Sequence, residues 1–285
     1  MTAFFYRKPK LRLGFLLSPP LLWLGLAYLG ALAALFVTAF WHTDSFTGQV
    51  IHSWNLDNFR AIADAPYPTI ILRTVGMATA VTLTCMLLAF PYAYFLVRVA
   101  GPRLRVILLV ATVLPLWVSY LVRVYSWRLI LNPDGALNWA LDLVGLPDLN
   151  IAYTNWAMWV VFTYIWLPFM VLPVYAALER VPQSYLEASA DLGAHGPTTL
   201  RRVIFPLAVP GLAAGSIFTF SLTLGDYIAP SLVGGPGSSL IGTVVFENLG
   251  LANNAPFAAA FATVPLAIMA VYLVIMKRLG AFESL

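Results

Sequence analysis

The segment from Glu187 to Pro206 has the sequence EASADLGAHGPTTLRRVIFP and is the only long stretch after the first third of the chain that is polar and lacks an apolar run of membrane length. Strongly apolar runs flank it on both sides. A polar segment between two membrane-spanning helices must lie in water on one face of the membrane, where it can contact a soluble molecule. We therefore expect a docking site here, and an ordinary helical loop is the alternative.

Cap residues predict two short helices joined by a bend in this segment. Ser184, followed three residues later by Glu187, fits a capping box that starts a helix after Pro182. Gly193 ends this helix. Gly196 then fits the N-cap of a second helix, with Pro197 at its first position. A second helix of this kind runs through Arg201 and Arg202 toward Pro206. Small residues give the region a surface with little side-chain bulk: Ala188, Ser189, Ala190, Gly193, Ala194 and Gly196.

The composition is that of an all-α polytopic membrane protein. Of 285 residues, 61% are hydrophobic and only 10% are charged, and the mean hydropathy is +0.84. A soluble domain is far less apolar. The single cysteine, Cys85, lies in an apolar run, so no disulfide framework is expected. The net charge of +4 is explained below by membrane topology, and we expect no nucleic-acid partner.

Six apolar stretches are long enough to cross a bilayer, for which about 20 helical residues suffice. The first is too long for the core of a signal peptide and is expected to be retained. We predict a single transmembrane domain over residues 1–285, with a polar loop at 179–206. The predicted spans are about 13–41, 69–97, 106–131, 156–178, 207–230 and 257–276.

Charge sets the orientation of these spans. Placing both termini, residues 98–105 and residues 179–206 on one side collects 12 of the 16 basic residues there. The positive-inside rule makes that side cytoplasmic. The opposite face is mildly acidic, which suits a cationic substrate but also follows from charge-biased topology alone. The loop at 179–206 is therefore predicted to be cytoplasmic.

The motifs of catalysis are missing from the sequence. It contains no H-E-x-x-H, no G-x-S-x-G, no paired cysteines and no P-loop, and its three histidines are scattered along the chain. We expect no enzyme activity, no catalytic residue, no metal site and no cofactor on this chain. If ATP drives transport, its hydrolysis must occur on another subunit.

Asp226 is the most informative charge because it lies within the predicted span at 207–230. An ionisable group at membrane depth is costly to bury and is by default a functional candidate. An ion pair with Arg123 or Arg128, at a similar outer depth, is the structural alternative. Aromatic residues nearby offer faces to an organic cation, although such residues also form interfacial belts. The expected substrate path contains Asp226, Tyr227, Trp117, Tyr120, Arg123, Tyr125 and Trp127.

The polar segment resembles a known motif. Glu187-Ala188-Ser189, Gly193 and the Val203 to Pro206 end match the spacing of the loop E-A-A-x3-G-x9-I-x-L-P of type I ABC importer permeases. Ser189, Val203 and Phe205 depart from it by small changes of size or shape. In that family the loop is the coupling helix, which seats in a groove on a cytoplasmic ATPase. The resemblance implies ATPase-docking residues Glu187, Ala188, Ser189, Asp191, Gly193, Ala194 and Gly196.

A finer resemblance covers nearly the whole chain. The segments 114–123 and 135–138, Trp127, and Gly225-Asp226-Tyr227 are similar to the first permease subunit of spermidine/putrescine importers. This implies an inner-membrane permease with a second homologous permease, two ATPase subunits that hold ATP and Mg, and a periplasmic binding protein for a small cation. Permeases for amino-acid-like compounds share these segments. A secondary transporter is less favoured, because neither an internal repeat nor a second midplane carboxylate is evident.

Overall fold

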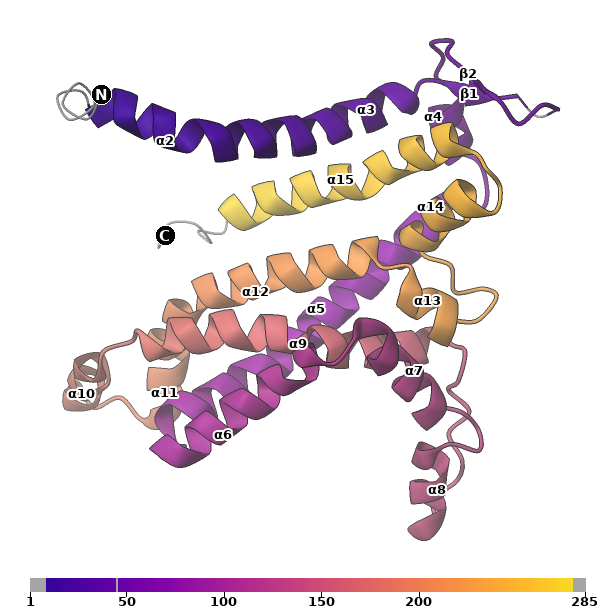
Figure 1. Ribbon diagram of the computed structural model, residues 1–285. Helices are drawn as coiled ribbons and strands as arrows, with labels where there is room; N and C mark the ends of the chain where they lie inside the picture. The colour runs from indigo at the N-terminus through magenta and orange to yellow at the C-terminus, as the bar shows by residue number, and fades with distance from the viewer. Residues whose placement is uncertain (1–8, 45, 279–285) are drawn as a thin grey trace. The chain divides into compact units, whose positions relative to one another are not determined.

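The structure is a computed structural model that describes residues 9–44 and 46–278, with side chains described from Leu13 onward. The orientation prediction also uses Arg7, Lys8 and the C-terminal tail. Arg7, Lys8 and the part of the tail beyond Arg278 lie outside the described residues. Most of the described chain is helical, which confirms the all-α fold class. Figure 1 shows the helices and one small hairpin.

The elements are α2 (Pro9–Leu24), α3 (Gly30–Thr38), β1 (His42–Thr43), β2 (Val50–Ile51), α4 (Asp57–Ile62), α5 (Tyr67–Arg98), α6 (Pro102–Val113), α7 (Tyr120–Ile130), α8 (Ala136–Leu143), α9 (Asn155–Glu179), α10 (Gln183–Asp191), α11 (Gly196–Thr199), α12 (Phe205–Gly225), α13 (Ile228–Val233), α14 (Ile241–Gly250) and α15 (Ala255–Arg278). Single π-helical turns at Gly25–Leu29 and Leu200–Ile204 and a 3₁₀ turn at Leu114–Trp117 join some of them.

Five continuous helices in the described residues are long and apolar enough to cross a membrane. They are Leu13–Thr38, Tyr67–Arg98, Asn155–Glu179, Gly196–Gly225 and Ala255–Arg278. A sixth span exists if the bent pair Pro102–Trp117 and Tyr120–Ile130 is taken together. These helices overlap the six stretches that hydropathy predicts.

The predicted third span, 106–131, is a broken helix in the structure. Its two halves meet at an angle of 98°. Val118 and Ser119 both have extended backbone, each with a ψ of 138°, and they separate the 3₁₀ turn from α7. Pro115 lacks an amide hydrogen and cannot continue the helical ladder, which accounts for a break near this point. The bend redirects α7 and with it Tyr120.

The fifth predicted stretch, 207–230, also differs from the structure. Its helix begins earlier, at Gly196, and ends at Gly225. Asp226 has extended backbone, with φ −75° and ψ 131°, and the chain resumes as the short helix α13. Asp226 therefore lies at a helix break, where its side chain is free to cap or to bind, and not within a continuous span.

The chain divides into two compact units, of which the first comprises the described parts of 1–64 and residues 247–263. Its hairpin pairs His42 with Ile51 in antiparallel register. Ala39 packs with Ala259 and Ala260, and partly buried Phe59 covers them. The apolar window of the helix at 13–38 has no residue buried by its own unit.

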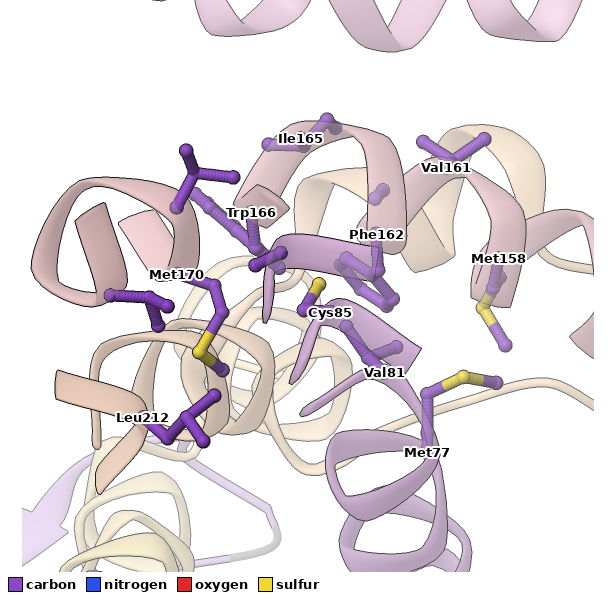
Figure 2. Packing of buried hydrophobic residues seen from close by; sticks show 14 of the residues in the cluster. Met77, Val81, Cys85, Met158, Val161, Phe162, Ile165, Trp166, Met170 and Leu212 are labelled. Carbon is purple, nitrogen blue, oxygen red and sulfur yellow. The ribbon is translucent and has the colours of Figure 1, made fainter. Parts of the chain in front are cut away.

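The second unit comprises residues 65–246 and the described part of 264–285, and it contains the main core. Helices α5, α9 and α12 pack on one another there. Figure 2 shows Val81 and Cys85 of α5 facing Phe162 of α9, with Met170 and Leu212 beside them. All five side chains are buried. This core fixes the positions of α9 and α12, which carry parts of both candidate sites described next.

Two glycines allow α12 to approach α9 closely. A Cβ atom at Gly211 would lie 2.6 Å from the Cβ of Ala177, and one at Gly215 would lie 2.5 Å from the sulfur of Met170. Real side-chain contacts are longer than this. The Gly211-x-x-x-Gly215 pair is thus a helix-packing motif, as small residues spaced in this way are in other membrane helices.

Candidate functional site

The polar loop contains the predicted first helix, α10, but not the predicted capping box. Helix α10 begins at Gln183, and Pro182 is its N-cap with φ −64° and ψ 145°. No side chain caps this end. Ser184 lies inside the first turn, so the capping-box prediction for Ser184 and Glu187 is wrong. The extended backbone of Pro182 already places the chain at the helix start, two residues earlier than the box requires.

Gly193 ends α10 as predicted. Its φ is +76°, a conformation that favours glycine. The amide of Gly193 donates to the carbonyl of Ala190 at 2.8 Å, and the amide of Ala194 donates to that of Ser189 at 3.0 Å. These two bonds form a Schellman motif. A side chain at position 193 would strain the bend that separates α10 from the next helix.

The second predicted helix begins one residue earlier than expected and is not separate from the following span. His195 is the N-cap of α11, so Gly196 is the first helical residue. Helix α11 continues through the π-helical turn Leu200–Ile204 into α12. The wide turn comes just before Pro206, which cannot donate a hydrogen bond into the helix. The last part of the loop is therefore continuous with the span that contains α12.

A hollow of about 590 Å³ lies between α10, the bend and α11. Ala188, Ser189, Gly193 and Ala194 line it, as does Arg202. Small residues form one wall and a guanidinium stands at the edge. The structure thus brings most of the predicted docking residues to one concave surface. Glu187, Asp191 and Gly196 are exposed beside it.

Ser189 is the exception among the predicted docking residues because it is buried. Its hydroxyl lies 2.9 Å from that of Thr199, which joins α10 to α11. Conversely, Leu192 is 88% exposed at the tip of the loop, and sequence reasoning missed it. A large apolar side chain directly before the terminating glycine was the available signal. Such an exposed leucine is suited to a pocket on a partner.

One arginine attaches this loop to α5, and a second joins α6 to the end of α5. Arg98, at the end of α5, donates to the carbonyl of Val181 at 2.8 Å. Arg105, in α6, donates to the carbonyls of Leu96 and Val97 at 2.9 and 2.8 Å. The guanidinium groups thereby satisfy carbonyls at the end of α5 and at the start of the loop. The base of α10 is held to α5 through Arg98.

The second candidate site is centred on Asp226. The hydroxyl of Tyr120, in α7, donates to Oδ2 of Asp226. The amide of Ala229 donates to Oδ1 at 2.9 Å and thereby caps α13. Neither Arg123 nor Arg128 belongs to the ion pairs found between described residues. The carboxylate therefore has hydrogen-bond donors but no protein cation, so the ion-pair alternative is not what the structure contains.

Aromatic rings surround this carboxylate. The Tyr120 ring stacks on Trp166 of α9 with centroids 5.8 Å apart and planes at 14°. Tyr227 stacks on Phe246 at 4.5 Å and 15°. Together with Asp226, they border a pocket of about 320 Å³ that is lined by Tyr120, Trp166, Ser221, Asp226, Tyr227 and Ile228. A carboxylate beside aromatic faces is the chemistry that binds organic ammonium groups.

Only three of the predicted path residues line this pocket, namely Tyr120, Asp226 and Tyr227. Trp117 is 90% exposed on the 3₁₀ turn, and Tyr125 is also exposed. The ring of Trp127 packs against Tyr164 at 5.2 Å. These three lie on α7 or just before it, and their sequence proximity to Tyr120 does not bring them into the pocket.

Two residues beside the pocket owe their positions to packing. Trp166 lies in the apolar run of α9 and was not predicted, because only packing places its ring on Tyr120. Arg123 was predicted as a path residue, but it is buried with its Cζ 5.7 Å from the Tyr120 ring centroid. Its Nε and Nη1 atoms, and Nε1 of Trp166, have no hydrogen-bond partner.

Comparison with known proteins gives one consistent result. Residues 86–281 match the family described as binding-protein-dependent transport system inner membrane component. The chain is 46% identical over 298 residues to the inner membrane ABC transporter permease protein YdcU of Escherichia coli (strain K12), covering 100% of this chain and 95% of that protein. It is 34% identical over 227 residues to the spermidine/putrescine transport system permease protein PotB of Salmonella typhimurium (strain LT2), covering 79% of each.

Among solved structures, chains of ABC transporters have a similar fold. A chain from the crystal structure of a bacterial ABC transporter involved in the import of the acidic polysaccharide alginate superposes with a TM-score of 0.78, covering 98% of this chain and 99% of that one. The sequence identity is 17%. At this identity the similarity concerns the fold alone.

Proposed function

The chain belongs to the family of binding-protein-dependent transport system inner membrane components, the permeases of ABC importers, and from this we propose that it imports polyamines such as spermidine and putrescine. Similarity to the spermidine/putrescine permease supports this substrate class. The relative at 46% identity is described as an ABC transporter permease, without a substrate, and does not decide the question. Family membership favours ATP-driven transport over the secondary-transporter alternative.

The pocket around Asp226 is the observation that carries the proposal. Asp226 has no cationic partner among the described residues, and the faces of Tyr120 and Trp166 lie beside it. An ammonium group that enters the pocket gains a charge-assisted hydrogen bond to the carboxylate and attraction to the rings. A polyamine carries such groups at both ends of a flexible apolar chain. Its remaining methylene groups suit the apolar side chains of the pocket rim.

The transport cycle that we propose requires partner subunits. A second homologous permease completes the path, a periplasmic binding protein delivers substrate, and two ATPase subunits bind ATP and Mg on the cytoplasmic side. We assign the loop at 179–206 to that side, with both chain termini, on the basis of the positive-inside rule. The hollow beside Gly193 and the exposed Leu192 then face the ATPase.

Coupling in this scheme runs through two connections of the loop. Helix α11 is continuous with α12, which ends next to Asp226. Arg98 ties the start of the loop to α5. When ATP draws the two ATPase subunits together, the loop moves with them, and the displacement reaches the pocket along α12 as a rigid element. The expected result is an opening of the pocket toward one side at a time.

Uptake by the complete transporter reconstituted in vesicles tests the substrate assignment. Asp226→Asn removes the charge with little change of shape, and we expect spermidine uptake to need at least about tenfold more substrate for half-maximal rate. A charge-assisted hydrogen bond contributes roughly 1.5–3 kcal/mol, and about 1.4 kcal/mol is tenfold. Asp142→Asn is the matched control, because Asp142 is an exposed acid on α8 outside the pocket. Equal kinetics for both variants would refute a role of Asp226 in substrate binding.

A second candidate substrate class is a small amine that also carries a carboxylate. Trp166 lines the pocket, and its buried Nε1 is a hydrogen-bond donor without a partner among the described residues. An ammonium group cannot satisfy this donor, whereas a carboxylate oxygen can. Putrescine and 4-aminobutyrate differ in this one terminal group. Competition of each against labelled spermidine separates the two classes, and stronger inhibition by 4-aminobutyrate would replace the polyamine assignment.

A further inference from the structure

A groove of about 530 Å³ runs along the outside of α5 and α9, away from both sites described above. Arg73 and Asn155 stand at one end of it. Gly76 and Ala80 of α5 form its floor, and a Cβ atom at Gly76 would meet nothing within 4 Å. Trp159 of α9 forms part of its wall. The groove is therefore open, apolar along its length and polar at one end.

The groove has the length of one membrane leaflet. Arg73 and Leu83 both line it, and ten residues of α-helix rise about 15 Å. The hydrocarbon core of a bilayer is about 30 Å thick. The far end is closed by a hydrogen bond of 3.1 Å from Nε1 of Trp159 to Oγ1 of Thr84, which satisfies both polar groups. A ligand thus meets charge at one end and only apolar contacts at the other.

Arg73 retains capacity to bind an anion. One of its five N–H donors, on Nη1, is hydrogen-bonded at 3.3 Å to the carbonyl of Ser239. It takes part in neither of the two ion pairs found among the described residues. A guanidinium with free donors at the level of the membrane interface suits a phosphate group, with which it forms bidentate hydrogen bonds. Trp156, beside Asn155, is 63% exposed, as is usual for tryptophan at that level.

We propose that this groove binds one phospholipid, whose phosphate contacts Arg73 and whose acyl chain lies over Gly76 and Ala80. Charge complementarity and the length of one leaflet favour a lipid over a transmembrane helix of a partner, which would continue across the whole bilayer. Asn155 begins α9, and the polar loop follows the other end of that helix. Given the proposed orientation of the loop, the bound lipid belongs to the outer leaflet.

Native mass spectrometry of the purified, delipidated transporter titrated with palmitoyl-oleoyl phosphatidylglycerol tests this proposal. Wild type is expected to gain one tightly bound lipid. Arg73→Gln should weaken its binding about tenfold, the loss expected for one charge-assisted hydrogen bond. Gly76→Trp should abolish it by filling the groove. Arg60→Gln, which removes a charge from an exposed loop helix, and Leu72→Trp, which adds bulk outside the groove, are the matched controls.

The proposal is overturned if Arg73→Gln and Arg60→Gln bind the lipid equally well, and this comparison holds even if Gly76→Trp fails to fold. A second measurement excludes a protein occupant. A fluorophore on Ala80→Cys in the assembled transporter should be quenched by phosphatidylglycerol with brominated acyl chains, and the natural thiol of Cys85 is buried. Absence of quenching would assign the groove to the partner permease instead.

Discussion

The close approach of α12 to α9 predicts that Gly211→Ala destabilises the second unit. The new Cβ atom would lie 2.6 Å from both the Cβ of Ala177 and the carbonyl oxygen of Pro173. Carbon atoms in contact are usually about 3.5–4.0 Å apart, so the helices must separate locally by roughly 1 Å. Overpacking of this kind costs about 1–3 kcal/mol. Gly76→Ala is the control, because its Cβ atom meets nothing within 4 Å.

The buried thiol of Cys85 provides the assay. Cys85 is the single cysteine and lies between α5 and α9, so a thiol-reactive fluorogenic dye labels it only when the core opens. For a domain of this size about 1 kcal/mol corresponds to 2–4 °C. We expect the midpoint of labelling to fall by roughly 2–12 °C for Gly211→Ala on this scale.

Gly76→Ala should leave the midpoint unchanged or raise it slightly, because alanine is preferred over glycine in a helix by about 0.5–1 kcal/mol. The reasoning fails if Gly211→Ala unfolds at the same temperature as Gly76→Ala. Such a result would mean that the two helices are not in close contact at this point.

Three further predictions concern coupling and binding. Gly193→Val, or Glu187→Lys in the proposed docking surface, should reduce uptake while ATP hydrolysis and membrane insertion persist. A valine at φ +76° is strained, and the loss is measured as molecules imported per ATP hydrolysed. Arg98→Ala should also lower this ratio, since it frees the loop from α5, whereas unchanged coupling would make the link to Val181 incidental. Tyr120→Phe keeps the ring but removes the hydrogen bond to Asp226, and uptake assays should show a weaker effect than Asp226→Asn.

Hydropathy was sufficient to predict the approximate locations of the membrane helices, although one of the six predicted spans is a bent pair of helices in the structure. Apolar length is a property of each segment alone, and it does not depend on neighbours. The bend at Gly193 was predictable for a similar reason, because a glycine after a short polar helix is a local stop signal that the structure uses as expected. Features determined by one segment of sequence are therefore those that were predicted well.

The structural predictions that failed concern features that are determined by a neighbouring residue or helix. Ser184 and Glu187 have the spacing of a capping box, but the helix α10 has its N-cap at Pro182, two residues earlier. The extended residues Val118 and Ser119 follow the 3₁₀ turn at Pro115, and no hydropathy plot reveals a break of 98°.

The residues that form the pocket around Asp226 were also only partly predictable from local sequence. Asp226 and Tyr120 are far apart in sequence, and their pairing depends on the direction that the broken span gives to α7. Trp166 joins them from a third helix. An ionisable residue near a membrane helix indicated the site, but its aromatic partners were determined by tertiary packing. Trp117, Tyr125 and Trp127 were plausible candidates by sequence proximity, and they lie outside the pocket.

The most direct test of ATP-driven polyamine import uses vesicles that contain the chain with its partner permease and ATPase subunits. Radiolabelled spermidine and the binding protein are placed outside, and ATP with Mg is enclosed inside. We predict that uptake occurs only when both ATP and the binding protein are present, and that Asp226→Asn reduces it. Spermidine uptake that continues without ATP would contradict the account. So would ATP-dependent uptake of another solute by vesicles that take up neither spermidine nor putrescine.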